Sequence, residues 1–393
     1  MHTPGPVIRY CTAASGISAV RIVLPEDEAF NGAVADSPQG RLLVYRTGQK
    51  KPSLASCLLD AEFRPVADSY QRLNLCRNID PRLIWFGDQL HMTTSYHGAG
   101  YHSERIELRR LTLADGRIAG WDDLGKFDAI LADPAYVRVR EKNWAPFVHD
   151  GRLYLVHQLQ PHRVLRFEPA GRGDETSRVG RGTVPFYSAD SAKGDSPRAD
   201  SANGASPRRC SGQVALVASS RFALPSAWSG DWSTRELRLN SPAVRLADGS
   251  YLSTFHTASR KDYFNGFYTF RGHPPFQVER VSARPVTVPS DATGRNRRNR
   301  RSGCIFLQSL LVDEAADRVE LAGGDNDHSV IILELSLAKV LSGMIAVETV
   351  PEAALSLPGR ATASLPAAAG LAFPAAPSPS GDFVRFKGSG PLA

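Results

Sequence analysis

The sequence lacks several features that mark large protein classes. It has no uninterrupted apolar run of about 18 residues, which a membrane-spanning helix requires. Its first residues contain no apolar segment typical of a secretory signal, and no Asn-x-Ser/Thr glycosylation acceptor occurs. These absences argue against a membrane-bound or secreted protein, and we expect a cytoplasmic one.

Cysteine is scarce and irregularly placed. The five cysteines form no Cys-x-x-Cys pair, and no spacing of histidines and acidic residues is typical of a zinc or calcium site. The cysteines are Cys11, Cys57, Cys76, Cys210 and Cys304. An odd number of isolated cysteines fits reduced thiols better than a disulfide framework. We therefore expect neither a metal nor a cofactor.

Positive charge is concentrated in one place. The chain has 47 basic and 40 acidic residues, a formal net charge of +7. The heptamer RNRRNRR at Arg295–Arg301 holds five arginines, and without it the balance is 42 against 40, or +2. The rest of the chain therefore lacks the broad basic surface of a nucleic-acid-binding protein, and we expect no nucleic-acid partner.

Two segments have too few large apolar side chains to pack in a core. One is a tandem repeat, ADSAKGDSPR (189–198) followed by ADSANGASPR (199–208), and the other is the Ala/Pro/Ser/Gly-rich end from about Pro351. Such compositions cannot bury enough surface to offset the entropy lost on ordering. We predict a disordered insertion at 189–208, a disordered C-terminal tail at 351–393 and one folded domain at 17–350.

The folded part has little helical periodicity but contains a repeated pair of short strands. Each copy has a leading polar residue, an apolar strand, a turn 7 to 9 residues after the leading residue, and a second strand. The leading residues are Asn31, Asp80, Asn143, Asn240 and Gln308, with turns at Gly40, Asp88, Gly151, Gly249 and near Ala315. Five such units predict an all-β fold, a five-bladed β-propeller. The alternative is a pair of β-sandwiches with unrelated hairpins.

The repeat predicts a polar ring at one end of a central channel. The innermost strand of each propeller blade lines the channel, so we expect the five leading residues to lie at equivalent positions there. Four of them are amides, whose donor and acceptor atoms suit hydroxyl-rich ligands. Asp80 is the one ring member that can transfer a proton, which makes it the candidate catalytic residue.

Basic side chains recur in the same units. Three of the second strands end in histidine, and the last unit carries two aspartates; these residues are His97, His157, His256, Asp325 and Asp327. The basic candidates are Arg46, Arg82, Lys142, His162 and His256. If these cations meet at the channel mouth, they form a clamp for an oxyanion such as phosphate. The alternative for each histidine alone is a structural hydrogen bond.

Several stretches resemble the β-mannoside phosphorylases and hydrolases of glycoside hydrolase family 130 and the related β-1,2-mannosyltransferases. The most specific are DPR at Asp80–Arg82, EKNW at Glu141–Trp144, the strand pair from Pro242 to His256, and GGDND before His328. The similarity touches all five units, over about residues 30–350. One departure is Ile79, where many family members have glutamate.

The resemblance implies roles for residues that match the family's motifs. It makes Asp80 the general acid, acting through a sugar hydroxyl, and it makes Lys142 and His256 the best-matched phosphate ligands, with Arg46, Arg82 and His162 as additions. It also implies that Asp327, or second Asp325, contacts the sugar. The further substrate-binding candidates are Asn31, Arg46, Arg82, His97, Asn143 and Asn240.

The reaction expected from the resemblance is inverting phosphorolysis of β-mannosides. Inorganic phosphate would attack the anomeric carbon while Asp80 protonates the departing sugar, so no second carboxylate is needed to activate water. The partners would be an oligosaccharide or glycan and phosphate or a sugar phosphate. The alternatives are a β-1,2-mannosyltransferase with a nucleotide-sugar donor, a β-mannoside hydrolase, and a non-catalytic propeller that binds glycans or proteins.

Overall fold

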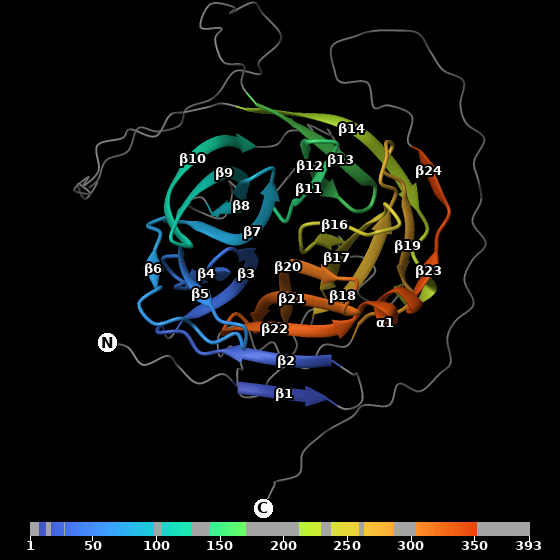
Figure 1. Ribbon diagram of the computed structural model, residues 1–393. Helices are drawn as coiled ribbons and strands as arrows, with labels where there is room; N and C mark the ends of the chain where they lie inside the picture. Colours follow the sequence, from blue (N-terminus) through green and yellow to red (C-terminus); the bar gives the residue numbers. More distant parts are fainter. Residues whose placement is uncertain are drawn as a thin grey trace, which may run out of the picture. The chain divides into compact units, whose positions relative to one another are not determined.

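The computed structural model describes residues 8–12, 17–26, 28–97, 104–127, 142–169, 212–228, 237–258, 263–286 and 304–351. Their strands form five antiparallel sheets arranged around a common centre, with the first strand of each repeat unit innermost (Figure 1). The predicted five-bladed β-propeller is therefore confirmed. The tandem repeat at 189–208, the arginine tract at Arg295–Arg301 and the tail beyond Pro351 lie outside the described residues.

Four of the blades follow the chain in order, from the centre outward. Blade 1 holds β3 (Ala29–Ser37), β4 (Gly40–Thr47), β5 (Ser53–Leu59) and β6 (Gln71–Arg72). Blade 2 holds β7 (Asn78–Phe86), β8 (Gln89–His97), β9 (Glu104–Ala114) and β10 (Arg117–Phe127). Blade 3 holds β11 (Ala145–His149), β12 (Arg152–Gln158), β13 (His162–Glu168) and β14 (Gln213–Phe222). Blade 4 holds β15 (Arg238–Leu239), β16 (Val244–Arg245), β17 (Tyr251–Ala258), β18 (Tyr263–Phe270) and β19 (Val278–Ser282).

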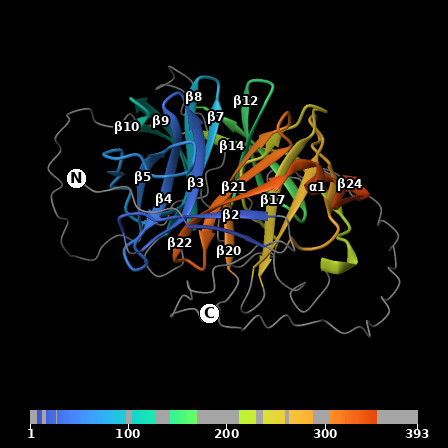
Figure 2. The same ribbon diagram turned by 60° about the horizontal axis from the view of Figure 1, so that its bottom comes forward.

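Blade 5 is built from both ends of the described chain. Its inner strands are β20 (Ile305–Asp313), β21 (Arg318–Asp325) and β22 (Ser329–Ser336), and its outer strands are β2 (Ile17–Ile22) and β1 (Ile8–Thr12). The pairing of β2 with β22, visible in Figures 1 and 2, closes the ring without a covalent link. The described strands thus begin before Ile17, where we placed the start of the folded domain.

The last described elements brace the outer edges of two blades. A short helix, α1 (Leu337–Ser342), follows β22. After it, β23 (Met344–Ala346) pairs with β19 of blade 4, and β24 (Thr349–Pro351) pairs with β14 of blade 3. A 3-10 turn at Ser226–Trp228 precedes blade 4.

The apolar core is divided among the five contacts between neighbouring blades. Each of the five buried clusters takes its side chains mainly from two adjacent blades, because the faces of a flat blade are covered only by its neighbours. The cluster between blades 3 and 4 is the most aromatic, with Phe147 in contact with Tyr154, Tyr251, Phe270 and Phe276. This packing holds the inner strands, and hence the channel residues, in fixed relative positions.

Among the residues that the structure describes, no helix is long and apolar enough to cross a membrane. The prediction of a cytoplasmic location stays a prediction.

Candidate functional site

The leading polar residues of the repeat occupy irregular points of the innermost strands. Asn31, Asp80 and Asn143 have left-handed backbone conformations, with φ of 55°, 55° and 63°. The strand register shifts at Asn31 and Asp80, and again at Gln308 of β20. Asn and Asp tolerate this conformation better than other residues with a Cβ, so the backbone itself favours them here. The predicted similarity of these positions therefore has a cause in the backbone, which would favour Asn or Asp there even without a ligand.

Asp80 is held from the neighbouring blade. The Asn31 side-chain nitrogen donates a 3.0 Å hydrogen bond to Asp80 Oδ1, and both side chains are almost fully buried. Asn31 in turn packs against Gly324 of blade 5, where an added Cβ would lie 2.1 Å from Asn31 Oδ1. Three blades thus meet around the carboxyl group, and only a glycine leaves room for the amide that orients it.

Arg82 is buried beside Asp80 and hydrogen-bonds three blades. Its guanidinium donates to the carbonyl of Asp80 at 3.1 Å and to Asn143 Oδ1 at 3.2 Å, and it also binds the Asn240 carbonyl on blade 4. The side chain is 1% exposed, and burial lowers its pKa to about 10, against an opposing effect of Asp80. Arg82 remains charged at neutral pH. Because its donors are committed to protein oxygens, it braces blades 2, 3 and 4 and does not present the free cation that we predicted.

Asn240 links Arg82 to His256. Its amide nitrogen donates to Asn265 Oδ1 at 3.0 Å, and this fixes the amide so that its oxygen faces His256 Nδ1 at 2.5 Å. Asn265 continues the chain to the Ile305 carbonyl of blade 5 at 3.1 Å. The site is therefore one hydrogen-bonded network that runs through all five blades, from Asn31 to Ile305.

His256 is neutral in this environment. Burial, reinforced by the charges of Arg238, Lys142 and Arg82, holds its pKa well below the usual value. The ring stacks on Tyr263 at 4.7 Å and meets the Phe306 ring edge-on at 5.3 Å. Since Nδ1 donates to Asn240, the neutral ring offers Nε2 as an acceptor. This arrangement fits a sugar hydroxyl or a protonated phosphate oxygen, and the neutral His256 adds no positive charge to the site.

A second group of predicted residues lies between blades 1 and 5. Arg46 stacks over the Phe30 ring at 4.7 Å and donates to the Gln49 carbonyl at 3.5 Å. The Gln49 side chain in turn donates to the Asp327 carbonyl at 3.2 Å. Asp327 is half-buried in the turn after β21. Its carboxylate is thus better placed to meet a ligand than that of Asp325.

Asp325 is buried and hydrogen-bonded within its own turn. It is 1% exposed, and its Oδ1 accepts a 2.7 Å hydrogen bond from the Asn326 side chain. Its backbone carbonyl closes the turn by accepting from the His328 nitrogen at 2.9 Å. Of the two aspartates, the geometry favours Asp327 as a ligand-binding residue, as the resemblance also does.

The remaining strand-end residues lie on blades 2 and 3. His97 ends β8 and is half-buried, and its backbone nitrogen donates to the Arg77 carbonyl. Lys142 is half-buried next to Asn143, and its charge acts on His256. His157 makes an edge-on contact with Trp144 at 5.2 Å. Lys142 is thus one of three basic residues whose charge acts on His256, together with Arg238 of blade 4 and Arg82 of blade 2.

The structure does not bring His162 to this network. Its side chain is fully buried at the start of β13, against the rings of Tyr268 and Phe270 on blade 4. Burial in these aromatic surroundings lowers the pKa of His162 to about 3. The prediction that it joins the phosphate-binding cations is wrong, because its ring is enclosed by the aromatic side chains of blade 4.

This burial predicts a pH effect on stability. His162 stays neutral in the folded protein down to about pH 3, whereas in the unfolded chain it takes up a proton near pH 6.5. The unfolded state therefore binds more protons below pH 6.5, and stability falls there by about 1.4 kcal/mol per pH unit for this one group. His162→Phe should reduce the slope of unfolding free energy against pH by that amount between pH 6 and 4. Urea unfolding at several pH values measures it, and equal slopes would contradict the assignment.

Some site residues escaped the sequence analysis. Asn265 and Tyr263 lie on β18, the third strand of blade 4, and the repeat was defined on first and second strands only. Phe306 lies in β20, two residues before Gln308. Among the described residues, no three His, Cys, Asp or Glu side chains are grouped so that they could hold a metal ion.

Comparison with known proteins identifies relatives by fold only. No protein-family profile and no curated protein sequence matches the chain. Among solved structures, a putative glycoside hydrolase from Parabacteroides distasonis is 11% identical and superposes with a TM-score of 0.51, over 79% of this chain and 87% of that one.

Two further structures carry functional descriptions. A β-1,2-mannobiose phosphorylase from Listeria innocua, solved with β-1,2-mannobiose, is 13% identical with a TM-score of 0.50, over 86% of this chain and 98% of that one. The description of the other concerns glycoside hydrolase family 130. It states that this family of mannoside phosphorylases contains glycoside hydrolases that target β-1,2 mannosidic linkages in Candida mannan. This second structure is 12% identical with a TM-score of 0.51, over 85% of this chain and 94% of that one. The resemblance predicted from the sequence is confirmed as a shared fold.

Proposed function

We propose that the protein is an inverting glycoside phosphorylase acting on β-mannosides. The observation that carries this proposal is Asp80, an almost buried carboxyl group at a β-bulge of an innermost strand, oriented by Asn31 and supported by Arg82. A fixed carboxylic acid among amides suits proton transfer to a sugar. The shared fold with mannoside phosphorylases supports the same assignment.

The proposed reaction uses one protein acid. A phosphate oxygen attacks the anomeric carbon from the face opposite the leaving group, and the glycosidic C–O bond breaks as the departing oxygen takes the proton that Asp80 supplies through a sugar hydroxyl. The products are mannose 1-phosphate of inverted configuration and a shortened sugar. Phosphate is already a nucleophile, so a second carboxylate to activate water is unnecessary.

The phosphate-binding role rests on fewer cations than the sequence suggested. Lys142 and neutral His256 are the candidates near the network, whereas Arg82 is committed to protein oxygens and His162 is buried elsewhere. Lys142 would supply the charge, and His256 Nε2 would accept a hydrogen bond from protonated phosphate or from a sugar hydroxyl. Arg46 and Asp327 are proposed to meet the sugar from blades 1 and 5.

The direct test is an incubation of the protein with β-mannosides, with and without inorganic phosphate. We expect phosphate-dependent release of mannose 1-phosphate, measured by anion-exchange chromatography. Free mannose without phosphate would instead indicate hydrolysis, and transfer from a nucleotide sugar to an acceptor would indicate a mannosyltransferase. Absence of all three products over a broad panel of mannosides would favour a glycan-binding propeller.

A charge reversal tests the phosphate ligand. Lys142→Glu should raise the KM for phosphate at least about tenfold, because it replaces an attraction by a repulsion at the oxyanion. The urea midpoint should change little, since Lys142 is half-buried. Lys50→Glu, an exposed position on blade 1, is the matched control and should leave the KM unchanged. An unaltered KM in Lys142→Glu would remove this residue from the site.

A further inference from the structure

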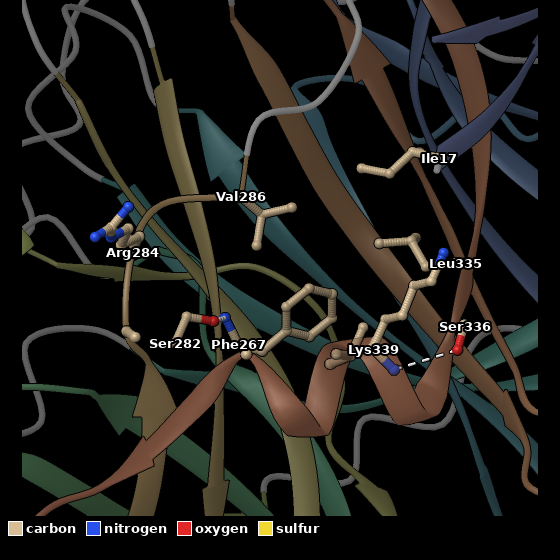
Figure 3. A pocket seen from close by; sticks show the side chains of 11 residues that line it. Ile17, Phe267, Ser282, Arg284, Val286, Leu335, Ser336 and Lys339 are labelled. Carbon is tan, nitrogen blue, oxygen red and sulfur yellow. Dashed lines mark hydrogen bonds between the residues drawn. The ribbon is translucent and has the colours of Figure 1, made fainter. Parts of the chain in front are cut away.

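A hollow lies between blades 4 and 5, away from the channel residues. It has a volume of about 370 Å³ and is closed on one side by α1. Figure 3 shows Phe267 at its centre, with Ile17 and Leu335 of blade 5 on one side and Val286 of blade 4 on the other. The volume lies in the range of small-molecule sites, about 300–1,000 Å³.

The interior of the hollow is apolar and firmly built. Phe267, Ile17 and Val340 are 3%, 4% and 8% exposed, and all three belong to the buried cluster between the two blades. Ser282 Oγ, which also lines the hollow, accepts a 2.8 Å hydrogen bond from the Phe267 nitrogen. An apolar body in this space would bury the surrounding apolar surface and leave this hydrogen bond intact.

Of the residues that the structure describes, the charged side chains at the rim of the hollow are positive. Lys339 and Arg284 line it, and no described Asp or Glu does. Among the described residues, neither cation has a carboxylate within ion-pair distance (4.0 Å), although Lys339 acts more weakly on Asp317, which caps α1. In Figure 3 the Lys339 side chain extends along the hollow so that its amino group stands beside Leu335, whereas the Arg284 guanidinium turns outward.

We propose that this hollow binds a small amphipathic anion, an aliphatic chain that ends in a carboxylate. The chain would occupy the space around Phe267, and the carboxylate would pair with the Lys339 ammonium, with Arg284 adding long-range attraction. A one-sided charge at the mouth of an apolar pocket selects such a ligand over a neutral or cationic one of equal size. This inference is independent of the proposed reaction at Asp80.

A second hollow provides an internal comparison. It lies between blades 2 and 3, has a volume of about 560 Å³, and is lined by Arg110, Arg152 and Arg166 together with Glu168. Two of its arginines are engaged, Arg110 by Asp122 at 2.5 Å and Arg166 by Glu168 at 2.6 Å. This hollow is also lined by basic side chains. A variant in it therefore shows whether an anion is attracted by any cluster of basic residues or binds specifically in the hollow next to α1.

The test is calorimetric titration of the full chain with octanoate, octanol and octylamine at low salt. We expect saturable binding of octanoate, at least tenfold weaker binding of octanol, and none of octylamine. Lys339→Glu should weaken octanoate binding at least tenfold, Lys339→Arg should restore it, and Val286→Trp, which fills the hollow, should abolish it. Arg152→Glu, in the other hollow, should leave binding unchanged.

Three outcomes would overturn the proposal. They are octanol binding as tightly as octanoate, octanoate binding that Arg152→Glu weakens and Lys339→Glu does not, and no saturable octanoate binding up to 10 mM, a limit of about 2.7 kcal/mol of binding free energy. Should Val286→Trp fail to fold, as judged by circular dichroism, the Lys339 pair decides alone, because that side chain is exposed on α1. Mannoside turnover measured on the same samples reports separately on Asp80.

Discussion

Asp80→Asn should lower the kcat for phosphorolysis of a β-mannoside by roughly 10²–10⁴-fold, the usual contribution of a positioned general acid. The amide cannot supply a proton at neutral pH, yet its oxygen can still accept the hydrogen bond from Asn31. The KM values and the folded structure should therefore change little. Initial rates of mannose 1-phosphate release, with circular dichroism of the variant, measure both effects.

The matched control for Asp80 lies in the same hairpin. Asp88 is exposed in the turn between β7 and β8, so Asp88→Asn removes the same charge at the far end of the innermost strand. Its kcat should equal that of the wild type. An Asp80→Asn variant with full activity would refute the catalytic role, and a loss shared with Asp88→Asn would point to a general effect of charge.

Arg82→Met should destabilise the fold by about 3–5 kcal/mol, the cost of disrupting a buried charged network. The substitution leaves the carbonyls of Asp80 and Asn240 and the side chain of Asn143 without their donor in a region closed to water. The free energy of unfolding, from urea denaturation followed by tryptophan fluorescence, measures the loss.

Two further variants distinguish the loss of the Arg82 hydrogen bonds from the loss of a positive charge. Arg82→Lys keeps the charge but cannot reach acceptors on three blades at once, so its loss should be smaller than that of Arg82→Met but clear. Arg117→Met removes an exposed arginine of β10 and should change the free energy of unfolding by less than about 0.5 kcal/mol. If Arg82→Met were as stable as Arg117→Met, the guanidinium would not hold the blades together. The prediction that Arg82 binds the ligand would then be favoured again.

The repeat was readable in the sequence because two local requirements coincide in each blade. A two-stranded hairpin needs a turn at a fixed distance from its start, and the left-handed residue at the bulge favours Asn or Asp. Asn31, Asp80 and Asn143 satisfy the second requirement directly. The recurrence of the hairpin in five units therefore revealed the number of blades, and the polar residue at the start of each unit marked its innermost strand.

The environment of each side chain was not readable in the same way. His162 and His256 look alike in the sequence, each a histidine at one end of a strand. One is enclosed by Tyr268 and Phe270 of the next blade, and the other hydrogen-bonds Asn240 in the channel network. Arg82 likewise has acceptors on blades 3 and 4, some 60 and 160 residues away along the chain.

The sequence by itself determined the five hairpins, the polar residue that begins each of them, and Asp80 as the one acid in that set. These features depend on turns, strand periodicity and backbone conformation, all of which act over a few neighbouring residues. Only the tertiary structure decided which of the basic side chains are buried or hydrogen-bonded inside the fold. That distinction depends on the desolvation and hydrogen bonding of each charge, which arise when distant blades close around it.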